Sequence, residues 1–269
     1  MKKIILLTTL LISLLFGCSK TGEEYFSEAA NLYKNKKYDE AILLFKKACE
    51  KENLKGCMFL AEIYKKGKVV PADNNTADSY YKKSFILADK YCINNNQNAC
   101  KTLSFLYENG FGVDKDLDKA DNAALKACNL GDGTACFYLA RVNADNITEF
   151  IDLSDKACQN NMAYACLVLG NTYITGFNES MAVMQKDIDK GISYIKKACE
   201  INNEICANLA DIYISGDDIA QDYETAVTFY ETALKYYETL CDEKNNDSPA
   251  CRSIEIIKSK YSFDNKTIY

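Results

Sequence analysis

Twelve of the thirteen cysteines recur along the chain as six closely spaced pairs, and this spacing constrains the fold more than any other feature of the sequence. Four pairs are eight residues apart, one pair is seven apart and one is ten apart. The pairs are Cys49/Cys57, Cys92/Cys100, Cys128/Cys136, Cys158/Cys166, Cys199/Cys206 and Cys241/Cys251. Twelve cysteines allow about 10⁴ pairings, but six similar local spacings indicate six local disulfides.

The same cysteines could instead bind a metal ion or carry out redox chemistry. The chain, however, contains no histidine and no Cys-x-x-Cys sequence. It therefore lacks histidine ligands for zinc and the usual motif of thiol oxidoreductases, and it cannot use Ser-His-Asp or Cys-His catalysis. We predict structural disulfides, no metal site and no cofactor.

Each cysteine pair belongs to a recurring frame of two helices. Counted from the second cysteine, an aliphatic residue stands at +3, a small residue usually at +4, tyrosine often at +7 and glycine at +10, as in Leu60, Ala61, Tyr64 and Gly67. Positions 0, +3, +4 and +7 share one helix face, and glycine is common where a helix ends. A second helix then ends at the next cysteine, often as Lys-Ala-Cys. Each bridge would therefore join the end of one helix to the start of the next.

The unequal spacing between repeats follows from a base period of 36 residues. Two repeats are longer because seven inserted residues add two turns to the second helix, which leaves its buried face unchanged. Before the first cysteine pair, residues 25–36 and 38–51 have the pattern of another helix pair, and a helix near residues 251–261 would close the array. The sequence predicts an all-α fold, an α/α superhelical solenoid of about six to seven disulfide-stapled helix pairs over residues 23–269.

The first residues have the pattern of an export signal. Lys2 and Lys3 precede a mainly apolar run over residues 4–16. This run is too short to span a bilayer as a helix, which needs about 20 residues. An even number of closely paired cysteines also suits an exported chain, because thiols oxidise to disulfides outside the cytosol. We therefore predict a signal peptide over residues 1–17 and a location outside the cytosol.

Residues 15–18 (Leu-Phe-Gly-Cys) resemble the bacterial lipoprotein lipobox, whose cysteine is acylated and becomes the mature N-terminus. The resemblance implies lipidation of Cys18 and a flexible tether over residues 18–22. Ser19 is not the aspartate that retains many lipoproteins on the inner membrane, so a periplasm-facing outer-membrane lipoprotein is expected. The alternative is an ordinary secretory cleavage that leaves Cys18 unacylated and the protein secreted.

The charge balance limits the classes of partner. The chain has 32 Lys and Arg against 38 Asp and Glu, for a net charge of −6. An acidic chain is a poor electrostatic partner for nucleic acid or for an anionic membrane surface. We predict no nucleic-acid binding, and contact with a membrane only through the lipid anchor.

The pattern Cys-x2-Leu-Ala-x2-Tyr-x2-Gly, followed by Lys-Ala-Cys, resembles the Sel-one-like repeat in its disulfide-bridged form. It is similar to the Helicobacter cysteine-rich protein family, and it departs from that pattern at Asn143, where tyrosine is expected. The resemblance implies a superhelix with a concave binding surface. Members of the family are described as penicillin-binding proteins or weak β-lactamases, and as secreted proteins that engage host cells.

The implied β-lactamase activity can be compared with the residues present. Serine β-lactamases combine Ser-x-x-Lys with Ser-Asp-Asn and Lys-Thr-Gly. Ser79 and Ser193 each begin a Ser-x-x-Lys sequence, Lys-Thr-Gly occurs only at residues 20–22, and Ser-Asp-Asn is absent. We therefore assign no catalytic residue. A penicillin-binding protein with weak β-lactam hydrolysis, which would bind a β-lactam or a peptidoglycan-like ligand, remains the alternative function.

The frame also predicts which residues of the first helices face outward. Positions +3, +4 and +7 face the core, so +1, +5 and +8 are the exposed candidates. The +5 residues, which mix apolar and polar groups suited to a protein or peptide partner, are Glu62, Phe105, Arg141, Asn171 and Asp211. We predict a protein- or peptide-binding scaffold. The simpler interpretation of any one of these residues is a solvated helix face.

Overall fold

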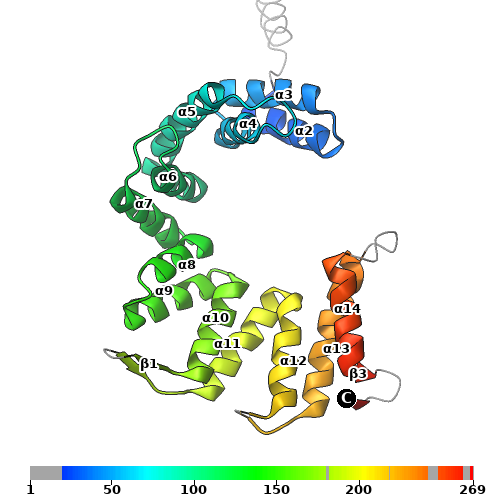
Figure 1. Cartoon of the computed structure of the whole chain (residues 1–269). Coiled ribbons are helices and arrows are strands. Elements are labelled where there is room, and N and C mark those ends of the chain that lie inside the picture. The colour runs from blue at the N-terminus through cyan, green and yellow to red at the C-terminus, as the bar shows by residue number, and fades with distance from the viewer. Residues whose placement is uncertain (1–19, 180–181, 218, 242–247, 263–266, 269) are drawn as a thin grey trace, which may run out of the picture. The chain divides into compact units, whose positions relative to one another are not determined.

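The computed structural model describes residues 20–179, 182–217, 219–241, 248–262 and 267–268 (Figure 1). The predicted signal peptide and Cys18 lie outside the described residues. The chain divides into two compact units between Ala123 and Ala124. A single continuous array over residues 23–269 stays a prediction.

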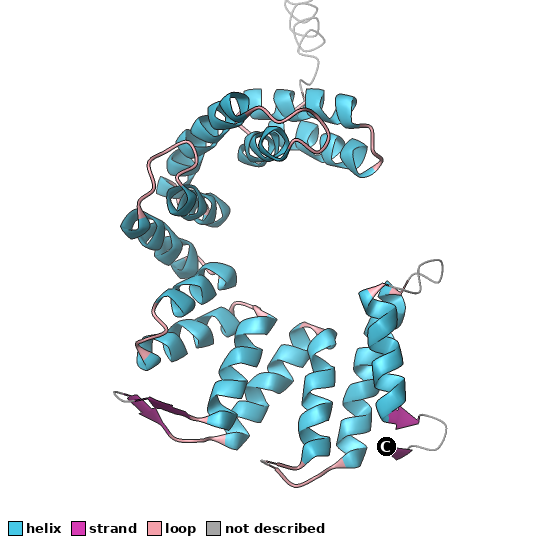
Figure 2. Cartoon of the chain, in the orientation of Figure 1, coloured by secondary structure: helices cyan, strands magenta, loops and turns pink. Residues whose placement is uncertain are grey.

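Helices joined by short turns make up most of each unit (Figure 2). The helices of the first unit are α2 (Gly22–Lys34), α3 (Tyr38–Glu50), α4 (Leu54–Lys66), α5 (Asn74–Ile93) and α6 (Gln97–Asn109). Those of the second unit are α8 (Gly133–Val142), α9 (Ile147–Gln159), α10 (Ala163–Thr175), α11 (Ile188–Ile201), α12 (Cys206–Ser215), α13 (Tyr223–Leu240) and α14 (Pro249–Lys260). Helix α7 (Leu117–Asn129) contains the boundary. The predicted helical-repeat solenoid is confirmed.

Helix α2 begins inside the segment predicted to be a flexible tether. The hydroxyl of Thr21 accepts a hydrogen bond from the backbone N–H of Glu24, and the carboxylate of Glu24 accepts one from the backbone N–H of Thr21. This capping box satisfies two N–H groups at the start of the helix. The Lys-Thr-Gly sequence at residues 20–22 is therefore the N-terminus of α2.

Two short strand pairs interrupt the helical pattern. Strands β1 (Phe177–Glu179) and β2 (Ala182–Met184) pair antiparallel in the long connection between α10 and α11. Strands β3 (Tyr261–Ser262) and β4 (Thr267–Ile268) pair after α14. The repeat pattern in the sequence predicts no strands. A long connection must satisfy its own backbone hydrogen-bonding groups, and pairing two extended segments does so.

The turn inside each of the first four disulfide loops has one backbone design. The third residue after the first cysteine has a positive φ in all four, and these residues are Glu52, Asn95, Gly131 and Asn161. The next residue precedes the following helix, and in three of the four its side chain accepts a backbone N–H: Asn53, Asn96 and Asp132. A left-handed residue reverses the chain, and the cap then starts the next helix.

Six disulfides close the turns between successive helices. They join the six pairs of neighbouring cysteines that the spacing indicates, with Cα–Cα distances between 4.6 and 4.9 Å. Ten of the twelve half-cystines lie one on each of the helices α3 to α12, and the last pair joins the end of α13 to α14. Each bridge fixes the angle at which one helix follows another.

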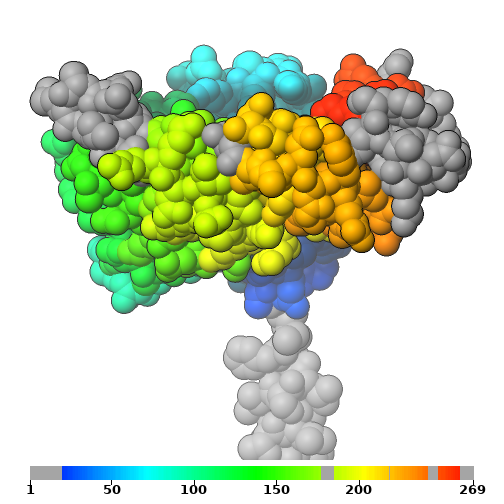
Figure 3. Space-filling model, turned by 90° about the horizontal axis from the view of Figure 1, so that it is seen from below, coloured from blue at the N-terminus to red at the C-terminus, as the bar shows by residue number. Residues whose placement is uncertain are grey.

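Each unit has an apolar core between its helices. In the first unit Phe45 and Leu60 are fully buried beside the Cys49–Cys57 disulfide, and Leu87 of α5 completes the cluster. In the second unit one cluster surrounds Cys158–Cys166 and another surrounds Tyr230. Figure 3 shows the yellow-green to orange helices of this unit packed side by side in chain order. No helix among the described residues is long and apolar enough to cross a membrane.

The last helix, α14, begins two residues before the predicted 251–261 segment and ends one residue before its end. Pro249 is the first residue of the helix, a position where the missing N–H costs no helical hydrogen bond. Ile257 of α14 is buried against the cluster around Tyr230. Helix α14 thus covers the apolar face of α13, as expected of a closing helix.

Candidate functional site

The five predicted binding residues all lie on first helices of the repeats. Four of them are exposed, whereas Glu62 is half-buried. Glu62 on α4 and Phe105 on α6 belong to the first unit. Arg141, Asn171 and Asp211, on α8, α10 and α12, belong to the second. The predicted site residues therefore fall into two sets, one in each unit.

Glu62 is held by two neighbours in the first unit. The hydroxyl of Tyr81, on α5, donates to its carboxylate at 2.5 Å, and the ammonium of Lys66 lies 2.6 Å away. Burial alone would raise the pKa of Glu62, but the hydrogen bonds from Lys66 and Tyr81 outweigh burial and hold the pKa below its ordinary value. Burial and the Glu62 carboxylate together raise the pKa of Tyr81. Glu62 is thus a charged acceptor with a fixed position.

An aromatic group connects Glu62 to Phe105. The ring of Tyr81 stacks on Phe111, with centroids 4.7 Å apart, and Phe111 meets Phe105 edge to face at 5.7 Å. The ammonium of Lys65 lies 3.4 Å from the centroid of Phe111. We call these five residues the α4–α6 cluster. The structure brings together two predicted site residues, Glu62 and Phe105, and joins them by two aromatic rings that the repeat pattern does not predict.

Gly112 holds this cluster in place. Its φ is +68°, and a Cβ there would lie 2.4 Å from backbone atoms of Tyr81 and Lys82. The loop after α6 therefore approaches α5 more closely than any other residue would permit. The signal in the sequence was the segment Gly110-Phe111-Gly112, in which an aromatic residue stands between two glycines.

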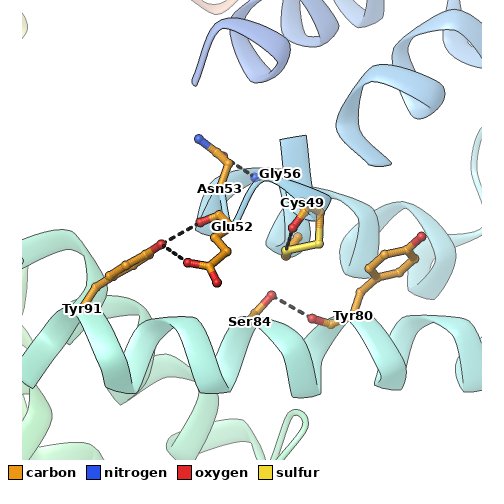
Figure 4. Close-up of a disulfide and its surroundings, with 8 residues drawn as sticks. Cys49, Glu52, Asn53, Gly56, Tyr80, Ser84 and Tyr91 are labelled. Carbon is orange, nitrogen blue, oxygen red and sulfur yellow. Dashed lines mark hydrogen bonds between the residues drawn. A yellow bond between two sulfur atoms is a disulfide. The ribbon is translucent and has the colours of Figure 1, made fainter. Parts of the chain in front are cut away.

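The extra turns of α5 rest on the preceding disulfide turn (Figure 4). The hydroxyl of Tyr91 donates to the backbone carbonyl of Glu52 at 3.0 Å, and the ammonium of Lys90 lies 2.7 Å from the Glu52 carboxylate. Near the start of the same helix Tyr80 stacks on Tyr64, with centroids 6.0 Å apart. These contacts fix α5, and with it Tyr81, against α4.

In the second unit Asp211 has partners within the fold. Its carboxylate accepts a hydrogen bond from the hydroxyl of Tyr230 on α13 at 2.5 Å, and the ammonium of Lys260 on α14 lies 2.8 Å away. Asp211 therefore joins three helices. Arg141 and Asn171 are exposed, and no described contact joins either side chain to the other or to Asp211. The three residues do not form a cluster like that of the first unit.

The two Ser-x-x-Lys sequences lack the geometry of a serine nucleophile beside a basic lysine. Ser79 is exposed, and Lys82 forms an ion pair with Asp78 at 2.8 Å. The hydrogen bond and charge of Asp78 raise the pKa of Lys82, which disfavours its role as a base. The hydroxyl of Ser193 donates to the backbone carbonyl of Lys190 at 2.7 Å. Among the described residues, no group of three or more acidic or cysteine side chains could hold a metal ion.

A family model described as the Sel1 repeat matches most of the chain. The matched residues are 34–53, 54–87, 98–132, 157–203 and 204–243. These segments contain nine of the twelve half-cystines, and the three outside them are Cys92, Cys136 and Cys251. The match covers well over half of the chain and agrees with the helix pairs described above.

One curated relative matches part of the chain. Over 115 residues the chain is 33% identical to cytochrome c oxidase assembly factor 7A of Xenopus laevis. The match covers 38% of this chain and 48% of the relative. The chain thus spans about half the length of this relative.

Several solved structures share the fold. A Sel1 repeat protein from Oxalobacter formigenes has a TM-score of 0.58 at 22% identity, over 87% of this chain and 99% of that one. The protein c5321, described as a protective antigen of uropathogenic Escherichia coli with an SLR fold, has a TM-score of 0.55 at 21% identity, over 90% of this chain and 50% of that one. Immunity protein Pa5087 of Pseudomonas aeruginosa has a TM-score of 0.50 at 17% identity, over 80% and 81%.

Proposed function

We propose that this chain, which belongs to the Sel1 repeat family, is an exported, lipid-anchored scaffold of the cell envelope and binds a protein or peptide. Sel1 repeat proteins are generally protein-interaction scaffolds. The observation that carries the proposal is the set of six disulfides, one across each turn between successive helices. Such disulfides persist where thiols are oxidised, outside the reducing cytosol.

The α4–α6 cluster supports the binding part of the proposal. Aromatic side chains are enriched in protein interfaces, where they carry much of the binding energy. Phe105 is 39% exposed, and the ammonium of Lys65 and the carboxylate of Glu62 lie beside the aromatic rings of the cluster. This mixture offers an apolar anchor together with fixed polar groups.

Binding or hydrolysis of a β-lactam is the other function that the family resemblance implies. No described contact around Ser79 or Ser193 favours it. Turnover of nitrocefin by the oxidised protein tests this function. Saturable hydrolysis that is lost in Ser79→Ala or Ser193→Ala would show that the protein is a β-lactam-hydrolysing enzyme and would contradict the scaffold proposal.

The anchoring part of the proposal is tested by the fate of Cys18. The full chain is expressed in a Gram-negative host that is fed an alkyne analogue of palmitate. We expect label in the wild-type protein and in the matched control Ser19→Ala, and none in Cys18→Ala. An unlabelled wild-type protein in the culture medium would leave export standing without the anchor, and an unlabelled cytosolic protein would contradict both.

The binding part is tested by photocrosslinking in the host cell. Benzoylphenylalanine is placed at Phe105, on a first helix, or at Leu43, an exposed residue of the second helix α3. We expect polypeptide adducts from position 105 and few from position 43. Equal yields from both positions would mean that the face of the first helices has no special role.

A further inference from the structure

A cavity of about 160 Å³ opens beside Glu62, between α2 and α4. Its apolar walls are Tyr33, Phe59, Ile63 and Val69. We call it the α2–α4 pocket. Its volume is sufficient for one large apolar side chain. It lies on the first helices of the repeats, the same face that the sequence predicts to bind a partner.

The walls of the pocket are fixed by aromatic packing. The ring of Phe59 lies 5.4 Å from that of Tyr33 and 4.8 Å from that of Phe45, measured between centroids. Phe45 is completely buried beneath them, yet Phe59 keeps 38% of its surface exposed. A partner that covers Phe59 would therefore bury apolar surface without first rearranging the pocket.

Two lysines and one carboxylate line the pocket, and further lysines stand beside its lining residues in the sequence. Lys66 and Lys68 line it, and six of the nine residues in the stretches 33–37 and 65–68 are lysine, with no acidic residue among them. Lys66 is paired with Glu62, whereas Lys34 and Lys68 are exposed and form no ion pair among the described residues. This concentration of positive charge stands out in a chain of net charge −6.

Lysines near the end of a helix also have a structural role, because they offset the negative end of the helix dipole. That role accounts for Lys34 and Lys66, which stand in the last turns of α2 and α4. It does not account for Lys68, which follows the left-handed Gly67 and lies outside the helix. Nor does it explain why Lys66 and Lys68 line a pocket with apolar walls.

We propose that the α2–α4 pocket takes one aromatic or branched aliphatic side chain of an acidic peptide segment, whose carboxylates lie against Lys34 and Lys68. The inference rests on the proposed binding function and assigns it a place and a class of partner. Charge complementarity selects the acidic segment, and the apolar walls select its anchor. Glu62 and Lys66 also line the pocket, but their ion pair offsets both charges and leaves Lys68 as the lining cation without an ion pair among the described residues.

The test uses the absence of tryptophan from this chain. The oxidised full chain is titrated into the peptide acetyl-Asp-Glu-Trp-Glu-Asp-amide, whose tryptophan fluorescence then reports its own burial without background. We expect a saturable blue shift that a phenylalanine version of the peptide competes away and an alanine version does not. The basic peptide acetyl-Lys-Lys-Trp-Lys-Lys-amide should show no saturable shift.

Two variants locate the binding. Lys34→Glu/Lys68→Glu should weaken affinity by at least about tenfold, and Val69→Phe should do so by filling the pocket. The matched control Lys235→Glu/Lys258→Glu changes the net charge equally at exposed lysines of the second unit and should bind as the wild type does. Circular dichroism checks that each variant is folded, and the double lysine variant keeps the test valid if Val69→Phe is unstable.

Three results would overturn the inference: no saturable shift, equal binding of the basic peptide, or equal loss of affinity in the control variant. If the peptide fails to bind while position 105 still forms adducts in cells, the proposed role of the α2–α4 pocket is wrong and the proposed scaffold function is retained. If both fail, the proposed function falls as well.

Discussion

Tyr81 and Tyr230 occupy the same place in two different repeats. Each stands four residues after the alanine that begins the buried face of a second helix, and each hydroxyl donates to the +5 carboxylate of the preceding first helix, Glu62 or Asp211. These are the two repeats whose second helix is two turns longer. A tyrosine hydroxyl bonded to a carboxylate thus fixes each long helix against its neighbour.

Removing the hydroxyl of Tyr81 is predicted to destabilise the first unit. Tyr81→Phe keeps the ring on Phe111 but leaves Glu62 with one partner fewer. Hydrogen bonds to charged groups contribute about 1.5–3 kcal/mol, so we expect the free energy of unfolding in urea to fall by about 1 to 2 kcal/mol. The control is Tyr223→Phe, which removes an exposed hydroxyl bonded to Gln221. This variant should change the free energy of unfolding by less than about 0.5 kcal/mol.

The same variant predicts a dependence on pH. The pKa of Glu62 in the folded chain lies below its ordinary value of 4.5. The stability from the charged carboxylate is therefore present above that value and is lost as the pH falls through the folded pKa. The difference between wild type and Tyr81→Phe should be constant from pH 7 to 5 and shrink below 4.5. A difference that grew in acid would contradict the assigned contact.

For single residues, the sequence predicted the exposure of the +5 side chains better than it predicted their contacts. Four of the five +5 residues are exposed, as the helical period requires. The period could not show that Tyr81 and Phe111 join Glu62 to Phe105, because Phe111 lies in a loop whose course depends on the close approach of Gly112 to α5.

At the scale of the elements, the turn between α2 and α3 repeats the design of the disulfide turns without a disulfide. Lys36 has a positive φ, as Glu52 has in the first disulfide turn. The backbone N–H of Lys36 donates to the carbonyl of Tyr33, just as the N–H of Glu52 donates to the carbonyl of Cys49. Counting along the two turns, Tyr33 and Ala41 occupy the positions of Cys49 and Cys57.

This equivalence predicts that a seventh bridge can be introduced. Tyr33→Cys/Ala41→Cys should form a disulfide on oxidation, because the two turns have the same backbone hydrogen bonds. Thiol titration of the unfolded protein should find no additional free thiols. The control Tyr33→Cys/Ile42→Cys places the second sulfur one residue later, on another side of the helix, and should retain both. The same thiol count in the two variants would show that the turns are not equivalent.

The caps of the bridged helices give a second prediction for the elements. The side chain of Asn96 accepts the backbone N–H of Ala99 at 2.9 Å and starts α6. Asn96→Ala should lower the free energy of unfolding by about 1 kcal/mol. Asn98→Ala changes the exposed second residue of the same helix and should leave the free energy of unfolding within about 0.5 kcal/mol of wild type. Equal effects in thermal or urea unfolding would contradict the capping role.

The helix boundaries were predictable because the stop and start signals are local. The glycines at +10 take a left-handed conformation at Gly67, Gly110 and Gly216, where three first helices end. The strand pair β1–β2 was not predictable from the period, because it depends on how a long connection pairs with itself.

For the whole molecule, the observed architecture and the proposed compartment and function all depend on the six disulfides. Closing a loop of about nine residues contributes roughly 2.5 kcal/mol in the chain-entropy model, and six such loops contribute about 10–15 kcal/mol. That is comparable with the stability of an entire domain. The fold class could be predicted from the cysteine spacing and the helical frame, and the family from the resemblance of the repeat motif, whereas the proposed class of partner rests on the pocket of the folded first unit.

Peptide mapping of the native protein under non-reducing conditions tests this account most directly. We expect six bridged peptides, each joining neighbouring cysteines: Cys49–Cys57, Cys92–Cys100, Cys128–Cys136, Cys158–Cys166, Cys199–Cys206 and Cys241–Cys251. Twelve free thiols, or sulfurs bridged between distant repeats, would contradict it.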